Sequence, residues 1–93
     1  MENNEYHSQR VQGAREIIGK AKNFAKEKGL SMDSCVWDEG QEIVERLMHT
    51  LTITSGTKLS RGKFPDKWLA DYPGKADSEK TDALLMQMIT GLV

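Results

Sequence analysis

Hydrophobic residues recur every three to four positions in three segments of the chain, which is the spacing of one face of an α-helix. The first segment runs from Tyr6 to Lys28, and its apolar positions are Val11, Ala14, Ile17, Ile18, Ala21, Phe24 and Ala25. Gly29 follows as a helix C-cap. Gly13 and Gly19 weaken this helix in isolation, and they indicate either a close helix crossing or a frayed beginning. The pattern predicts a helix over residues 6–28.

The second segment has the broadest apolar face and predicts a core helix. Asp33 or Ser34 can cap it, and its apolar positions are Val36, Trp37, Gly40, Ile43, Val44, Leu47, Met48 and Leu51. The end of this helix is open, because residues 50–54 alternate polar and apolar side chains as a strand does. Ser55 and Gly56 would then form a turn into a second strand. We favour the helix, since an isolated hairpin is only marginally stable in water.

Two further helices are predicted toward the C-terminus. Residues 66–71 have room for one or two helical turns. This stretch begins after Pro65 and ends at Tyr72-Pro73-Gly74, where proline and glycine end a helix. Asp77 or Ser78 caps the last helix, whose apolar residues cover about half of its circumference. Such a helix either lies centrally in the core or contacts a second chain. The candidate interface residues on it are Leu85, Met88 and Leu92.

These elements predict an all-α fold, a small three-helix domain with an additional short aromatic helix near residues 66–71. The alternative is an α+β fold with a short hairpin near residues 51–59. A chain of 93 residues is long enough for one hydrophobic core. We therefore expect a single domain over residues 1–93, with residues 1–5 flexible.

The charge balance, the cysteine content and the lack of long apolar stretches indicate the partners and the cellular compartment that the sequence does not favour. A formal net charge of -1 gives no overall field that attracts nucleic acid or an acidic membrane. The single cysteine, Cys35, cannot form an internal disulfide, and the sequence shows no secretory signal pattern. No apolar stretch approaches the ~18–20 residues that a bilayer span needs. We expect a cytoplasmic protein that does not enter a membrane.

No set of residues carries a recognisable reaction. Cys35 lies near a predicted helix start, but on one helix His49 would be ~21 Å away, too far to act as its base. Glu45 and His49 form only one edge of a metal site, because the other ligands are missing. Residues 56–64 fail as a phosphate-binding loop, since Phe64 replaces the hydroxyl that would hold magnesium. We expect no enzyme activity, cofactor, metal or small-molecule substrate.

One basic and aromatic segment remains as a candidate binding site. Its cations can neutralise phosphates and its aromatic ring can stack on bases; the residues are Lys58, Arg61, Lys63, Lys67 and Trp68. The simpler interpretation is a solvated loop. We expect a small non-catalytic regulatory, inhibitory or accessory protein that binds another protein, with a homodimer as one form of this function. The alternative is a nucleic-acid-binding regulator that uses residues 58–68.

Overall fold

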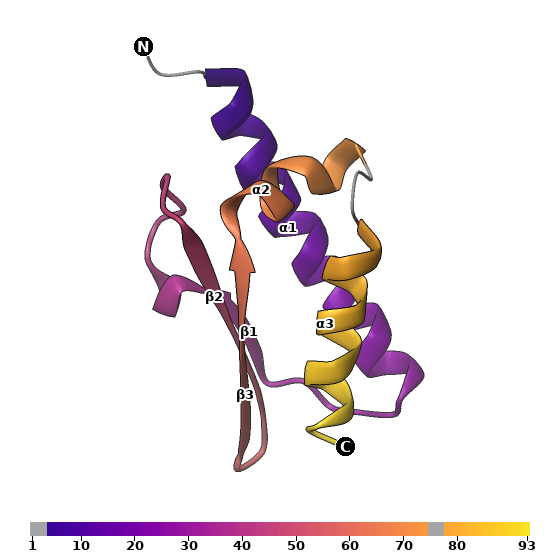
Figure 1. Ribbon diagram of the computed structural model, residues 1–93. Coiled ribbons are helices and arrows are strands. Elements are labelled where there is room, and N and C mark those ends of the chain that lie inside the picture. The colour runs from indigo at the N-terminus through magenta and orange to yellow at the C-terminus, as the bar shows by residue number, and fades with distance from the viewer. Residues whose placement is uncertain (1–3, 75–77) are drawn as a thin grey trace.

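The computed structural model of the protein describes residues 4–74 and 78–93 (Figure 1). The elements along the chain are α1 (Asn4–Glu27), β1 (Ser34–Trp37), the 3-10 helix η1 (Asp38–Gly40), β2 (Met48–Ser55), β3 (Lys58–Pro65), α2 (Asp66–Asp71), the 3-10 helix η2 (Tyr72–Gly74) and α3 (Ser78–Thr90). The strands form one antiparallel sheet in the order β1-β2-β3. The fold is therefore α+β.

The prediction of an all-α helical bundle is wrong, because the predicted second helix does not form. Its residues build β1, η1, a loop over residues 41–47 and β2. Consecutive residues at η1 have positive φ angles, 50° at Asp38, 60° at Glu39 and 86° at Gly40, whereas a right-handed helix needs φ near -60°. Four apolar side chains that the helical pattern assigned to the core are exposed, namely Val36 (38%), Val44 (42%), Leu47 (90%) and Met48 (42%).

The α+β alternative agrees with the structure in class but not in extent. The hairpin spans residues 48–65 rather than 51–59, and β1 adds a strand that the alternative did not include. Gly56, with φ of 62°, turns the chain between β2 and β3. Because β1 pairs along β2, the hairpin is part of a three-stranded sheet and is not the isolated hairpin whose marginal stability argued against it.

The other predicted helices are confirmed as α1, α2 and α3. Gly29, with φ of 71°, follows the end of α1 as predicted for a C-cap. Ser78 begins α3, whereas Asp77, the other predicted cap, lies outside the described residues. Of the terminal segment predicted to be flexible, residues 1–3 also lie outside the described part, and residues 4 and 5 belong to α1.

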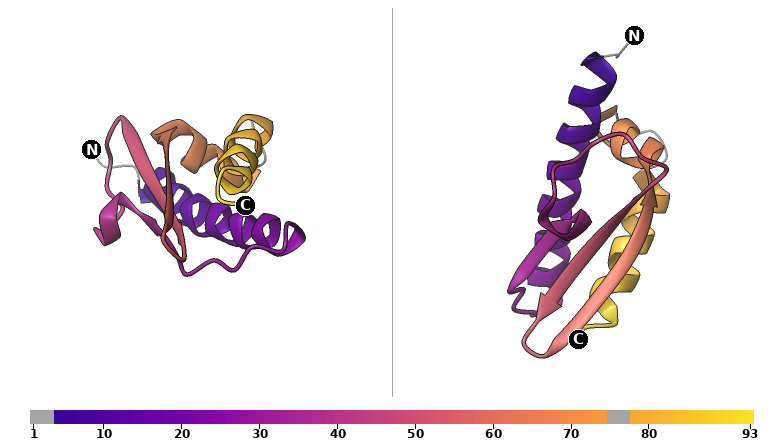
Figure 2. Two further views of the ribbon diagram at one scale, coloured as in Figure 1. Left: turned by 90° about the horizontal axis from the view of Figure 1, so that it is seen from below. Right: turned by 90° about the vertical axis from the view of Figure 1, so that its left-hand side faces the viewer.

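The helices α1 and α3 pack against one face of the sheet, and no helix of the described residues covers the opposite face (Figure 2). Side chains that alternate along the strands fill the space under the helices, and the largest of them are Trp37, Leu51, Ile53 and Phe64. We call this the inner face of the sheet. The opposite side, which the right-hand view of Figure 2 presents to the reader, is the outer face.

Two glycines allow the elements to approach closely. A Cβ atom on Gly13 would lie 1.7 Å from the carbonyl oxygen of Leu69, so α1 and α2 touch through their backbones. A Cβ atom on Gly62 would lie 2.5 Å from the sulfur of Met88, which places α3 directly on β3. The close helix crossing that was predicted as one reason for a glycine at position 13 is confirmed as the contact of α1 with α2. Gly19, by contrast, is exposed and has no such neighbour.

Candidate functional site

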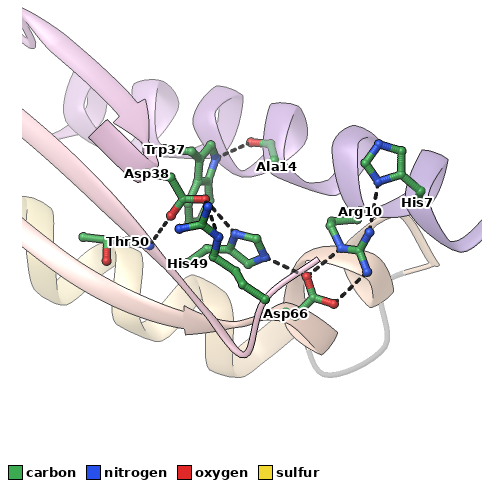
Figure 3. Close-up of polar contacts among 9 residues, drawn as sticks. His7, Arg10, Ala14, Trp37, Asp38, His49, Thr50 and Asp66 are labelled. Atoms are coloured by element: carbon green, nitrogen blue, oxygen red, sulfur yellow. Dashed lines mark hydrogen bonds and ion pairs between the residues drawn. The ribbon is translucent and has the colours of Figure 1, made fainter. Parts of the chain in front are cut away.

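A chain of buried polar side chains crosses the molecule from β2 to α1 (Figure 3). At its centre, His49 is fully buried at the start of β2. Its Nδ1 atom lies 2.8 Å from Oδ2 of Asp38, and its Nε2 atom lies 2.6 Å from Oδ1 of Asp66. An ionised carboxylate can only accept hydrogen bonds, so between two such groups both ring nitrogens must donate. The geometry therefore fits a positively charged imidazolium.

Asp66 links this histidine to α1. The Arg10 guanidinium donates two hydrogen bonds to its carboxylate, from Nε at 2.6 Å and from Nη2 at 3.0 Å, and Arg10 itself is only 1% exposed. Burial alone would raise the pKa of Asp66, but the hydrogen bonds from Arg10 and His49 outweigh burial and hold that pKa below its ordinary value. Arg10 also donates to Nδ1 of His7 at 3.0 Å. We call Asp38, His49, Asp66 and Arg10 the buried network.

Asp38 is held in a left-handed turn that directs its carboxylate back over β2. Its Oδ1 atom accepts the backbone N–H of Thr50 at 2.9 Å, just beyond the last β1–β2 pair, which joins Trp37 to Leu51. The side chain thus takes the place of a strand partner. A positive φ on a residue with a Cβ atom costs ~1–2 kcal/mol. The bonds to His49 and Thr50 offset that cost, and the Arg46 Nε atom lies 3.8 Å from Asp38 Oδ2.

The buried network has little capacity for catalysis. Both nitrogens of His49 are engaged and the ring has no exposed surface, so it presents no free base to a substrate. The network instead joins four parts of the fold: α1, η1, β2 and α2. In the described residues, no group of three or more histidine, cysteine or acidic side chains is arranged to hold a metal ion.

Sequence reasoning did not find the buried network. It placed His49 on the predicted second helix, outside the set of apolar core positions, whereas the strand turns this residue inward on the same face as Leu51 and Ile53. The alternation of threonines with apolar residues after His49 was the available signal, because in a strand with that period position 49 shares a face with positions 51 and 53.

Cys35 lies on β1, apart from the buried network. It lies on the inner side of β1, where burial raises the pKa of its thiol to about 11, with the nearby Lys22 acting weakly in the opposite direction. It pairs with Ile53, four residues along β2 from His49 and so ~13 Å away along the strand. The two side chains cannot form a catalytic pair.

The outer face combines apolar, hydroxyl and cationic side chains. Across its strands the registered neighbours are Val36 with Thr52 and Arg61, Ser34 with Thr54 and Leu59, and Thr50 with Lys63. This set contains no carboxylate. Val36 is 38% exposed and Leu59 is 53% exposed, so both edge strands, β1 and β3, present apolar surface to solvent on the outer face.

At one end of the outer face lies a hollow of about 280 Å³, which we call the basic hollow. Its lining residues are Asp38, Glu39, Gln41, Arg46, Thr50, Arg61 and Lys63. Within residues 4–74 and 78–93, Arg61 and Lys63 form no ion pair or side-chain hydrogen bond. The charge of Asp38, in contrast, is already met by His49 and the N–H of Thr50.

The structure separates the predicted phosphate-contacting residues. Arg61 and Lys63 share the outer face, but Lys58 alternates to the other side of β3, next to the turn. Lys67 is exposed on α2, and the Trp68 ring packs against Phe64 with centroids 6.2 Å apart. Only Arg61 and Lys63 are therefore brought together. The structure adds a cation that the sequence did not indicate, Arg46, through the loop between η1 and β2.

The predicted interface residues on α3 lie in the core of the single chain. Leu85 is 0% exposed, Met88 4% and Leu92 3%. They face the sheet and α1, so in this arrangement they offer no surface to a second chain.

Among the residues that the structure describes, no helix combines the length and hydropathy that a membrane span requires. Comparison with known proteins finds no matching family model, no matching curated protein and no matching solved structure.

Proposed function

We propose that this protein is a small non-catalytic regulatory or accessory protein that binds another protein through the outer face of its sheet. The observation that carries this proposal is the uncovered outer face, on which Val36 and Leu59 remain exposed beside a row of threonines. Apolar side chains ringed by polar and arginine side chains are typical of protein interfaces. The helices bury the inner face and leave this one available (Figure 2).

The charge of the outer face specifies the chemistry of the partner. Arg61 and Lys63 have no acidic partner among the described residues, and none of the registered strand residues of the outer face is acidic. The nearest acids, Asp38 and Glu39, line the basic hollow at its end. Complementary charge steers association and fixes register between proteins. The partner should therefore present acidic side chains around a small apolar centre. The strands of a second copy supply no such acids, which favours a different protein over a homodimer formed through this face.

The geometry gives less support to the nucleic-acid alternative. Its five candidate residues do not form one surface, since only Arg61 and Lys63 share the outer face. The aromatic ring that was to stack on bases, Trp68, is partly buried against Phe64. Without an aromatic platform, two or three cations supply only weak, salt-sensitive binding.

The proposal includes a non-catalytic role in the cytoplasm. The full engagement of His49 and the raised pKa of Cys35 support a non-catalytic role, because the chain then presents neither a free base nor a reactive thiolate at these positions. A chain with one cysteine has no internal disulfide to form, which is compatible with a reducing compartment.

Site-specific photocrosslinking in the source cells tests the proposed interface. A benzophenone amino acid replaces Leu59 on the outer face in one variant and Gln87, an exposed residue of α3, in the matched control. We expect Leu59 to crosslink to one protein species and Gln87 not to do so. The Arg61→Glu, Lys63→Glu double variant should abolish that crosslink while its circular dichroism spectrum stays unchanged. Identical crosslinks from both positions, or none from Leu59, would contradict the proposal.

A further inference from the structure

The basic hollow gathers three cations from two separate segments of the chain, and two of them, Arg61 and Lys63, form no ion pair among the described residues. Arg46 comes from the loop over residues 41–47, whereas Arg61 and Lys63 come from β3. The hydroxyl of Thr50 lies on the neighbouring strand, in register with Lys63. We propose that the basic hollow is a binding site for a phosphate monoester. This inference does not depend on whether a protein docks on the outer face.

The charge balance of the hollow favours an anion although two acids line it. Asp38 has only 2% of its side chain exposed, and it already accepts hydrogen bonds from His49 and Thr50. Its two carboxylate oxygens are therefore directed into the fold and engaged there. Glu39 is the remaining acid of the lining, against three cationic side chains. An anion that enters the hollow replaces part of the hydration of these cations.

The number of cations selects a monoester over a diester. A phosphate monoester carries up to two charges and three terminal oxygens near neutral pH. A diester carries one charge and two free oxygens. Arginine binds such oxygens through a planar fork, and lysine contributes a point charge. Three cations with a hydroxyl donor match the dianion.

The fold holds these groups close to the arrangement that binding requires. Arg61 and Lys63 are two residues apart on one strand, so they leave the same face ~6–7 Å apart. The Nε atom of Arg46 lies 3.8 Å from Asp38, which keeps the guanidinium at the rim of the hollow while 39% of the side chain stays exposed. A volume of about 280 Å³ is at the lower limit of small-molecule sites and suits a phosphate with one attached sugar.

Nuclear magnetic resonance titration of the full chain tests the site with defined probes at constant ionic strength. The probes are inorganic phosphate, adenosine 5′-monophosphate, its cyclic diester and adenosine. Inorganic phosphate and the 5′-monophosphate both carry up to two negative charges near neutral pH. We expect both of them to shift the amide signals of Thr50, Arg61 and Lys63. The cyclic diester should bind at least tenfold more weakly, and adenosine should produce no shift. Equal binding of the diester and the monoester would overturn the monoester assignment.

Variants of single cations separate a specific site from general charge attraction. Arg61→Gln and Lys63→Gln should each weaken binding of the 5′-monophosphate about tenfold, because each removes one charge-assisted contact. Lys58→Gln is the matched control, since it removes the same charge from the same strand on its other side. Equal weakening in the control, or no shift with any phosphate probe, would overturn the proposal. Leu59→Ser should impair the proposed protein interface and leave phosphate binding unchanged, so the two proposals fail independently.

Discussion

His49 shows how one residue can determine the positions of several elements. Its ring lies between two carboxylates from distant parts of the chain, those of Asp38 and Asp66. Among the described residues, no other histidine contacts either acid. Breaking a buried ion pair by removing one partner leaves an uncompensated charge in the interior. The consequence is a steep dependence of folding on this side chain, even though exchanging the whole network for apolar residues need not be costly.

We predict that His49→Ala lowers the free energy of unfolding by about 3–5 kcal/mol. Urea denaturation followed by circular dichroism measures the change. Met48→Ala is the control, because Met48 is the preceding residue and is 42% exposed, so it should change stability by less than about 1 kcal/mol. A loss below about 1 kcal/mol in His49→Ala would show that the buried network contributes little to stability.

Asp66 makes a separate prediction for acid. Its folded-state pKa lies below the ordinary value of 3.8, because the hydrogen bonds from Arg10 and His49 outweigh the opposing effect of burial. A depressed pKa contributes stability that is fully present above the unfolded-state value and is lost as the pH falls through the folded-state value. The stability difference between the wild type and Asp66→Asn should therefore shrink below about pH 4. Urea denaturation between pH 5 and pH 2 measures it, and a constant difference across that range would contradict the assignment.

Cys35 should be a slow nucleophile. A pKa of about 11 instead of 9.0 reduces the thiolate fraction at pH 8 about 100-fold, and only the thiolate reacts with alkylating agents. We predict that iodoacetamide labels the folded protein at pH 8 at least about 100-fold more slowly than it labels the urea-unfolded chain. Mass spectrometry of timed samples gives both rates. Labelling of the folded protein at the rate of the unfolded chain would show that the thiol is neither buried nor shifted.

At the scale of elements, the crossing of α1 and α2 depends on the absence of one side chain. A Cβ atom on Gly13 would be 1.7 Å from a backbone oxygen of α2, a distance that only a shift of the backbone can relieve. Gly19 lies on the exposed side of the same helix with open space around it. The two glycines have the same intrinsic effect on the helix and opposite tertiary environments.

We therefore predict opposite effects of one substitution at these two sites. Gly19→Ala should raise the free energy of unfolding by about 0.8–1 kcal/mol, the difference in helix propensity. Gly13→Ala should lower it by about 1–3 kcal/mol or more, because overpacking outweighs the gain in propensity. Thermal melts of the two variants beside the wild type decide the matter. A stabilised Gly13→Ala would mean that α1 and α2 do not touch at this position.

The elements also show where sequence reasoning succeeds. Helices α1 and α3 have apolar residues at spacings of three and four with no competing pattern, and Pro65 together with Pro73 isolates α2. Residues 50–54 are compatible with both the helical and the strand period, so periodicity alone could not decide where the predicted second helix ends. The strands form because β1 pairs with β2 and extends the hairpin to a three-stranded sheet, and because the left-handed backbone of η1 interrupts any helix. Both reasons are features of the tertiary structure.

The candidate site was predictable to a similar degree. Arg61 and Lys63 were identified from their charge, and the strand period then places them on one face. Arg46 was not identified, because a loop brings it to them across the sheet. The buried network joins residues that are distant in sequence, such as Arg10 and Asp66, and local pattern carries no information about pairs so far apart.

At the scale of the whole molecule, the sheet divides the basic residues into two groups. Arg61 and Lys63 lie on the outer face, with Arg46 at its end. The basic residues that the sequence places beside one another on α1, Arg15, Lys22 and Lys26, belong to the helix that covers the inner face. The two groups come from different layers of the fold, so nucleic acid bound on the outer face alone meets about three cations.

Three contacts predict weak binding with a shallow salt dependence. Each phosphate contact to duplex DNA contributes a slope of about -0.9 in log K against log salt, so the total slope should not exceed about -3. We expect no submicromolar complex with duplex or single-stranded oligonucleotides at physiological ionic strength. Fluorescence anisotropy across a salt series measures both quantities. A submicromolar complex with a slope near -6, weakened equally by charge reversal on α1 and on β3, would require one ligand to reach both sides of the sheet and would restore nucleic acid as the partner.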